Sequence, residues 1–151
     1  MFNKKKQKYT NELTELILND KNIAVEKVFS HELLSITIRN EAADFMEYIF
    51  PADQMEEKNP DLPNFDLVIE YALTNKEYKF EDDINTYPLT FIIGRNATNF
   101  LASPGKKLNE FGNKDNNKRI FKALRNFITT EDATNSMCAG NFSRIFSTWY
   151  N

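Results

Sequence analysis

The segment from residue 33 to residue 50, LLSITIRNEAADFMEYIF, constrains the fold more than any other part of the chain. Read at the helical period of about 3.6 residues, its apolar side chains fall on one face. They are Leu34, Ile38, Ala42, Phe45, Met46 and Ile49. That face is too wide for an exposed helix, so the sequence predicts a helix from Leu33 to Phe50 against which the other apolar segments stack. Pro51 stops the pattern.

Two apolar stretches are compatible with either a strand or a helix. In the first half of the long segment, Ile36, Thr37 and Ile38 are β-branched and favour a strand. The run LTFII at 89–93 is too short for its periodicity to decide, although Pro88 suits the first turn of a helix. We expect a helix for the long segment and leave both alternatives open for the second.

Polar side chains mark the expected starts of two helices. Thr10 is placed to cap a helix that begins at Asn11 and ends in the polar turn at 19–22. Ser30 follows a short apolar segment at 23–29 and is a candidate N-cap for the long helix.

Further helices are expected where apolar residues return at helical spacing. They lie at 65–72, ending near Thr74, at 120–128 and at 138–149. The stretch from 51 to 63 holds three prolines and few apolar residues, which predicts a loop with room for one exposed helical turn. Gly94 and Pro104-Gly105 are expected to interrupt the chain on either side of Phe100.

These segments predict an all-α fold of six to eight short helices. No exact repeat is visible, but successive helix pairs of this length fit an irregular helical-repeat stack of the HEAT or armadillo type. We expect residues 1–9 to be a flexible basic N-terminus. Residues 10–151 are expected to form a single helical domain, because a chain of 151 residues suits one domain with its own core.

Composition narrows the classes of partner and the compartment. The net charge is −3, so no global field favours nucleic acid or an anionic membrane. The cluster Lys4, Lys5, Lys6 and Lys8 is compatible with a nucleic-acid tail, but a solvated terminus is the simpler interpretation. The chain has one cysteine and no apolar run of membrane-spanning length. We expect a cytoplasmic protein, with the nucleus as the alternative.

No constellation of residues indicates catalysis, a cofactor or a metal. His31 is the only histidine, and no nucleophile stands at a defined spacing from it. Cys138 lies on the apolar stripe of the last helix, which predicts a buried, inert thiol. Glu81-Asp82-Asp83 lacks the ligand spacing of a calcium loop, and its charge indicates a solvated connector. Gly105-Lys106 lacks the flanking residues of a phosphate loop. The sequence offers no positive case for an enzyme.

The most promising exposed set consists of Lys118, Arg119, Lys122 and Arg125. These residues lie mostly off the apolar stripe of the helix at 120–128. One interpretation is a solvated helix face. The other is a basic patch that steers an acidic partner surface, and we take these four residues as the candidate partner-binding site.

Three stretches together resemble the SAPS-domain family, the regulatory subunits of protein phosphatase 6. Leu33-Leu34 and the later run FMEYI at 45–49 are similar to the leucine pair and the Leu-Leu-Asp-Phe-Leu-like run of the family. Tyr87-Pro88 resembles a family helix start. The third stretch resembles a helix, a turn, an Asn-Pro-Leu-like start and an Ala-x-x-Phe-Ser-Lys-Ile-like helix, with Ser136 in place of the usual Pro. Its residues are Phe127, Ile128, Asn135, Ala139, Phe142, Ser143, Arg144 and Ile145.

The resemblance implies an α-helical repeat scaffold that binds a phosphatase catalytic subunit and performs no catalysis of its own. The family domain is much longer than this chain. The resemblance does not identify the residues that touch the phosphatase. The alternative is a helical binding module, an inhibitor or adaptor, for another protein or for RNA.

Overall fold

The computed structural model describes residues 8–74, 86–103, 105, 108–110, 118–130 and 136–150. Every regular element in these ranges is a helix, which confirms the all-α prediction. The described ranges hold nine helices of four residues or more, so the predicted count of six to eight is too low. They are α1 (Glu12–Asn19), α2 (Val25–Phe29), α3 (Leu34–Arg39), α4 (Ala43–Ile49), α5 (Ala52–Met55), α6 (Pro63–Leu73), α7 (Thr86–Ala102), α9 (Lys118–Ile128) and α10 (Ser136–Trp149). No helix in the described ranges is both long and apolar enough to cross a membrane.

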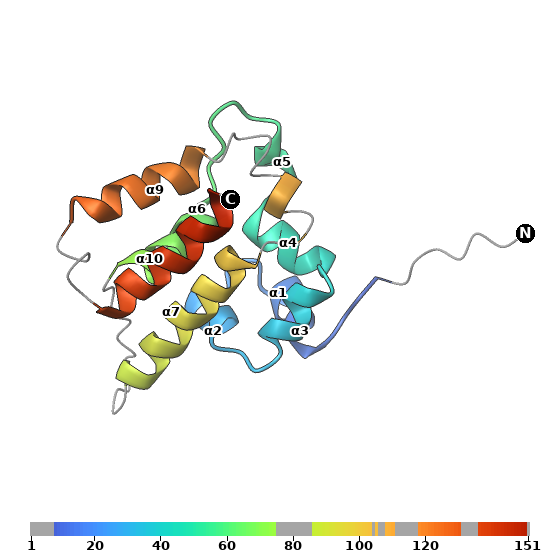
Figure 1. Cartoon of the computed structure of the whole chain (residues 1–151). Coiled ribbons are helices and arrows are strands. Elements are labelled where there is room, and N and C mark those ends of the chain that lie inside the picture. The colour runs from blue at the N-terminus through green and yellow to red at the C-terminus, as the bar shows by residue number, and fades with distance from the viewer. Residues whose placement is uncertain are drawn as a thin grey trace, which may run out of the picture.

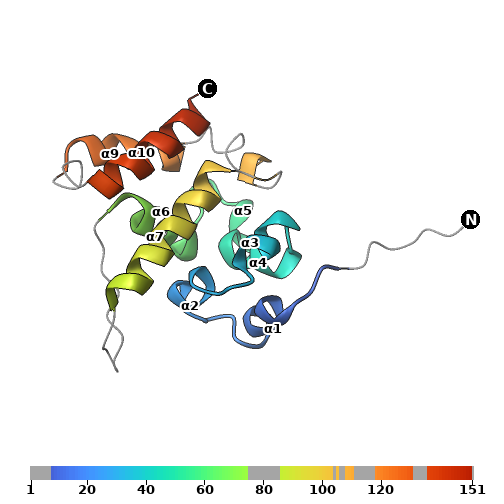
Figure 2. The same cartoon turned by 60° about the horizontal axis from the view of Figure 1, so that its bottom comes forward.

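Helices α6 and α7 lie at the centre of the fold and pack on each other (Figure 1). Helix α10 packs on both, and α9 covers the neighbouring surface of α6 and α10. On the other side, α1 contacts α3 and α4, while α2 and α4 connect this group to α6 (Figures 1 and 2). The segment that was expected to organise the fold therefore lies to one side of it, and α6 and α7 take the central place.

The predicted long helix from Leu33 to Phe50 is divided into α3 and α4. Helix α3 ends at Arg39, and Glu41 has a φ of 46°, a left-handed conformation that few non-glycine residues adopt. The chain continues through Ala42 in an extended conformation, and α4 begins at Ala43. The strand alternative for the first half is wrong, and so is the continuous helix. The break turns the chain so that both short helices contact α1.

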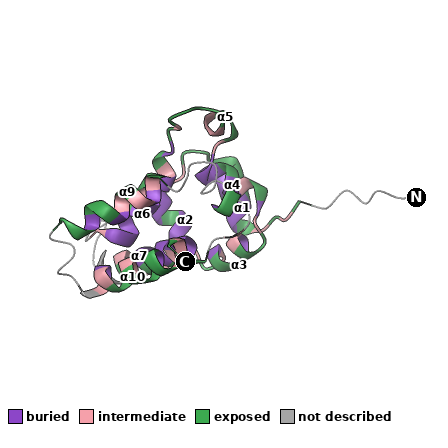
Figure 3. Cartoon of the chain, turned by 45° about the horizontal axis from the view of Figure 1, so that its top comes forward, coloured by how far each residue is buried: buried purple, intermediate pink, exposed green. Residues whose placement is uncertain are grey.

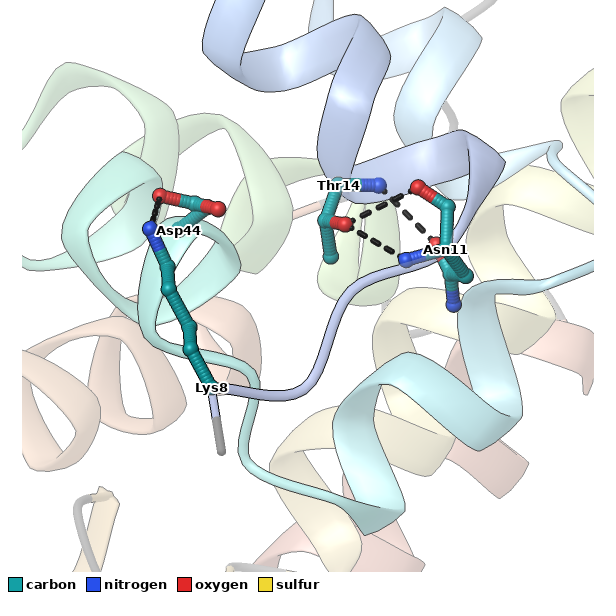
Figure 4. Close-up of polar contacts among 4 residues, drawn as sticks. All are labelled: Lys8, Asn11, Thr14 and Asp44. Atoms are coloured by element: carbon teal, nitrogen blue, oxygen red, sulfur yellow. Dashed lines mark hydrogen bonds and ion pairs between the residues drawn. The ribbon is translucent and has the colours of Figure 1, made fainter. Parts of the chain in front are cut away.

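Asn11, and not Thr10, is the N-cap of α1. Its Oδ1 accepts a hydrogen bond of 2.9 Å from the Thr14 backbone N–H, and its own N–H donates to Thr14 Oγ1 at 2.7 Å (Figure 4). This reciprocal pair is a capping box, which satisfies two otherwise unpaired groups at the helix start. Asn11 Nδ2 also donates to Thr37 Oγ1 on α3 at 2.8 Å. The cap therefore fixes α1 to its neighbour as well as starting the helix.

Ser30 ends α2 and does not cap α3. Its backbone N–H bonds to the carbonyl of Val28, and its Oγ donates to the carbonyl of Glu26 at 2.7 Å. Helix α3 begins instead after Leu33, which provides no side-chain cap. His31 Nδ1 accepts a hydrogen bond of 3.0 Å from the Leu33 N–H, so the only histidine has a structural contact at this turn.

The core joins the two groups of helices through three phenylalanine rings. Phe29 on α2, Phe45 on α4 and Phe100 on α7 have ring centroids 5.8 to 6.1 Å apart. All three are buried, and the inner faces of the helices are buried along with them (Figure 3). Such ring clusters add specific edge-to-face contacts to the burial of apolar area. The predicted burial of Phe45 is confirmed, since its exposure is 0%.

Helix α7 contains both the LTFII run and Gly94, so the strand alternative is wrong and Gly94 does not interrupt the chain. A Cβ atom placed on Gly94 would lie 3.2 Å from the carbonyl oxygen of Tyr71 on α6. This glycine instead allows the two central helices to approach closely. At the other end of α7, the Trp149 Nε1–H donates to the carbonyl of Leu101 at 2.9 Å. Thr148 Oγ1 donates to the carbonyl of Ala102 at 3.0 Å.

The remaining helix predictions hold well. Helix α6 matches the predicted segment at 65–72 and starts with Pro63 in its first turn. The expected exposed turn within the loop at 51–63 is α5. Helices α9 and α10 match the last two predicted segments.

Candidate partner-binding site on helix α9

Helix α9 has one apolar and one basic side. Ile120, Leu124 and Phe127 are buried against α6 and α10. On the opposite side, Lys118, Lys122 and Arg125 are exposed. The helix is therefore attached by its apolar stripe and presents cationic side chains to the solvent.

Arg119 differs from the other three basic residues because it binds within the protein. It forms an ion pair with Asp66 on α6, and its Nη2 donates to the carbonyl of Pro60 at 2.5 Å. Its side chain is 23% exposed. The expectation that all four residues form one exposed set is wrong for Arg119. This residue holds α9 on α6.

A cleft of about 480 Å³ lies between α6, α9 and the loop before α6. Its polar rim includes Lys58, Lys118 and Lys122, and its wall includes Arg119 with its partner Asp66. The full lining is Lys58, Asn59, Pro60, Asp66, Ile69, Lys118, Arg119, Lys122, Ala123 and Asn126. Lys58 was missed in the sequence because it lies in a loop sixty residues from the basic helix. Arg125 does not line the cleft.

A row of aromatic rings follows the boundary between α9 and α10, and we call it the aromatic ladder. Its members, in order along the row, are Phe127, Phe142, Phe146, Tyr150 and Phe121. Successive ring centroids lie 4.8, 5.6, 4.4 and 4.5 Å apart. Phe127 is buried, but Phe146 is 41% and Tyr150 53% exposed. The apolar stripe of the helix at 138–149 predicts that Phe142 is buried, but the ring is only half-buried and packs against the edge of the core.

Charge is distributed unevenly along the chain. Helices α9 and α10 contain five of its 19 basic residues and none of its 22 acidic residues. The overall negative charge therefore conceals a cationic pair of helices. Positive charge concentrated on one surface influences the approach of an acidic partner more than the net charge of the whole protein does.

The other candidate groups from the sequence give no second site. Cys138 is buried, as predicted. Within the described ranges, no three histidine, cysteine or acidic side chains lie close enough together to hold a metal ion. Lys8 forms an ion pair of 2.8 Å with Asp44 on α4 (Figure 4). Lys4 to Lys6, Glu81 to Asp83 and Lys106 lie outside the described residues.

Tyr48 lines a smaller pocket, of about 220 Å³, between α1 and α4. Its hydroxyl donates to the carbonyl of Ile23 at 2.5 Å. Burial raises the pKa of Tyr48 well above its ordinary value, and the nearby charges of Glu26 and Asp20 raise this pKa further. The phenol therefore stays protonated and keeps its hydrogen bond at neutral pH. Its geometry indicates a structural role.

No protein-family model, curated protein or solved structure matches the chain. The similarity to the SAPS-domain family consequently depends on the three sequence stretches alone.

Proposed function

We propose that the chain is a non-catalytic regulatory scaffold of the cytoplasm that binds a protein phosphatase catalytic subunit. The observation that carries the proposal is the exposed set Lys118, Lys122 and Arg125 on a helix that is fixed to the core. The phosphatase as partner follows from the resemblance to the SAPS-domain family. The packing of α6 on α7, successive long helices, supports a helical-repeat arrangement within this proposal.

The physical basis is electrostatic steering from a rigid surface. Complementary charges raise the rate of association and fix the orientation of the encounter, and they contribute less to final affinity. The ion pair between Arg119 and Asp66 holds α9 in place before the partner arrives. Lys118 and Lys122 stand on the rim of the cleft, where an acidic loop of the partner has room to enter.

The experiment measures association of the full chain with purified protein phosphatase 6 catalytic subunit by surface plasmon resonance. The test variant is Lys122→Glu with Arg125→Glu. The matched control is Lys27→Glu with Arg39→Glu, which makes the same change of charge at exposed positions on α2 and α3. We expect the test variant alone to slow association about tenfold or more and to weaken its dependence on salt.

Two outcomes would contradict the proposal. Absence of binding by the wild-type chain would exclude this phosphatase as the partner. Equal slowing in the test and control variants would exclude the α9 surface, since only net charge would then matter. The alternative function is a helical module that binds another acidic protein or RNA through the same cationic helices. It is the function to test if the wild-type chain does not bind the phosphatase.

A further inference from the structure

The aromatic ladder leaves large rings in contact with solvent beside the cationic side chains of α9. Phe146 lies between Phe142 and Tyr150 along α10, with interplanar angles of 24° and 18° to its two neighbours. Tyr150 also contacts Phe121 across the helix boundary. At the far end of α9, Ile128 is 64% exposed. The ladder therefore leaves apolar area exposed at the surface, as Leu16 and Leu18 do on α1.

The stacked arrangement determines which part of each ring meets the solvent. Phe142 and Tyr150 both stack on Phe146 with offset, nearly parallel rings, so less of its ring faces is left for a further stacking partner. Ring edges carry partial positive charge, which favours contact with carboxylates, and the apolar ring also packs on aliphatic side chains. A platform for nucleic-acid bases needs free ring faces, because the bases bind by stacking on them. The ladder therefore suits a protein partner better than a single-stranded nucleic acid.

Basic side chains border the ladder along α9. Arg125 is four residues after Phe121 and Lys118 is three residues before it, so both are its neighbours on the helix surface. Neither α9 nor α10 contains an acidic residue, and Asp66 on α6, which lines the cleft with Lys118 and Lys122, is paired with Arg119. An occupant of this surface must therefore combine apolar side chains with negative charge.

The spacing of the rings specifies the shape of that occupant. Phe142, Phe146 and Tyr150 repeat every four residues and form a row inclined to the axis of α10, with Tyr150 directly after its last residue. Apolar side chains on a second helix recur at three and four residues and pack against such a row. Small exposed residues beside it, Ser143 and Ser147, allow a close approach.

We propose that the aromatic ladder binds an acidic amphipathic helix of a protein partner. The apolar side of that helix packs on Phe146 and Tyr150, and its carboxylates face Lys118, Lys122 and Arg125. This inference rests on the proposed function only in placing the partner at α9. It adds the chemical class of the binding segment.

The test uses the full chain and a fluorescent synthetic helical peptide with leucine on one face and glutamate on the other. Binding is followed by fluorescence anisotropy. A peptide with lysine in place of glutamate, a scrambled peptide and an oligouridylate are the comparison probes. We expect the acidic helical peptide to bind most tightly. Phe146→Ser and Tyr150→Ser should each weaken it about tenfold.

Two further variants guard against effects on folding. Phe91→Ser on α7 is the matched control, because Phe91 is 39% exposed and lies outside the ladder. It should bind the peptide as the wild type does. Ser143→Glu, at an exposed position three residues before Phe146, removes no packing. It should weaken binding because it adds a negative charge beside the ladder.

Tighter binding of the lysine peptide or of the oligouridylate would overturn the inference, as would equal binding by Phe146→Ser. A wild-type dimer that Phe146→Ser converts to a monomer would also overturn it, by showing that a second copy covers the ladder. If the phosphatase subunit fails to bind but the acidic peptide binds as expected, only the proposed function fails. If charge reversal on α9 slows association with the phosphatase subunit, but the ladder variants bind the acidic peptide as the wild type does, only this inference fails.

Discussion

Arg119 on α9 and Asp66 on α6 form an ion pair across the edge of the fold, and the same guanidinium donates to the carbonyl of Pro60. Replacing Arg119 with Ala should lower the free energy of unfolding by about 1–2 kcal/mol. Most of this loss comes from the hydrogen bond to Pro60, because Asp66 is half-exposed and such ion pairs are screened by solvent. Lys122→Ala should change stability by less than about 0.5 kcal/mol. Urea unfolding followed by circular dichroism measures the free energy of unfolding of both variants. Equal losses would show that Arg119 does not hold α9 on α6.

The three-ring cluster should dominate the stability of the core. Phe45→Ala should cost about 3–5 kcal/mol, since Phe45 is fully buried between Phe29 and Phe100. Phe142→Ala should cost clearly less, about 1–2 kcal/mol, because its ring is only half-buried in the ladder. Chemical denaturation at equilibrium compares the two variants. A larger loss for Phe142 would mean that the ladder, and not the three-ring cluster, is the principal packing centre.

Two substitutions of Asn11 can separate its contributions to stability, which are the cap of α1 and the hydrogen bond to Thr37. Asn11→Ala removes the cap of α1 and the hydrogen bond to Thr37, so it should cost about 2 kcal/mol. Asn11→Asp keeps the Oδ1 acceptor for Thr14 but loses the Nδ2 donor, so it should cost about half as much. Thermal melting of both variants provides the comparison. Identical melting temperatures for the two variants would place the whole effect in the contact with α3, because Asn11→Asp keeps the cap.

Two glycines inside helices should respond to alanine in opposite directions. Gly140→Ala should stabilise the protein by about 0.5–1 kcal/mol, because nothing lies near its Cβ position and alanine favours a helix. Gly94→Ala gains the same propensity, but its Cβ would press on the carbonyl of Tyr71 in the adjacent helix. We expect Gly94→Ala to be destabilising overall. Differential scanning calorimetry tests the pair, and a rise in melting temperature for both would show that α6 and α7 have room to separate.

Tyr48 makes the fold sensitive to alkaline conditions. Its pKa in the folded state is raised mainly by burial, and the unfolded chain has the ordinary tyrosine value of about 10. The folded state therefore holds the phenolic proton more tightly, and this stabilisation is complete below pH of about 10 and is lost as the pH rises above it. The slope is up to about 1.4 kcal/mol per pH unit for one proton.

Tyr48→Phe is the matching variant for this pH dependence. It should lose about 1 kcal/mol at neutral pH, since the hydrogen bond to Ile23 is absent. Its stability should then fall less steeply than that of the wild type between about pH 10 and pH 12. Urea midpoints at several pH values measure both quantities. Parallel curves would assign the alkaline loss to other groups.

The helices with regular apolar spacing were predictable from the sequence, because periodicity is a local property. Helices α6, α9 and α10 follow their stripes closely. The break between α3 and α4 was not predictable, because no glycine or proline stands at 40–42 and Glu41 adopts the left-handed conformation that such residues usually provide. The apolar pattern continues across the break and so conceals it.

The candidate site was only partly predictable, because its geometry depends on distant residues. The sequence identified the basic residues of α9, but Asp66 lies 53 positions before Arg119 and only the packing of α6 on α9 brings them together. The spacing of the helix predicted at 138–149 places Phe146 on the apolar stripe and Tyr150 at its edge. Their exposure depends on the packing of α10 on α6 and α7, which leaves one side of that helix uncovered.

Thr148 and Trp149 donate hydrogen bonds to the last carbonyls of α7, so the end of α10 holds the C-terminal turn of α7 in place. Opening of the C-terminal turn of α7 therefore requires release of the final turn of α10, so the two turns should exchange their amide protons as one unit. Tyr150 directly follows these two residues and belongs to the aromatic ladder. Occupancy of the ladder consequently acts on the same local opening equilibrium, and Trp149, the single tryptophan, lies where its fluorescence would register the change.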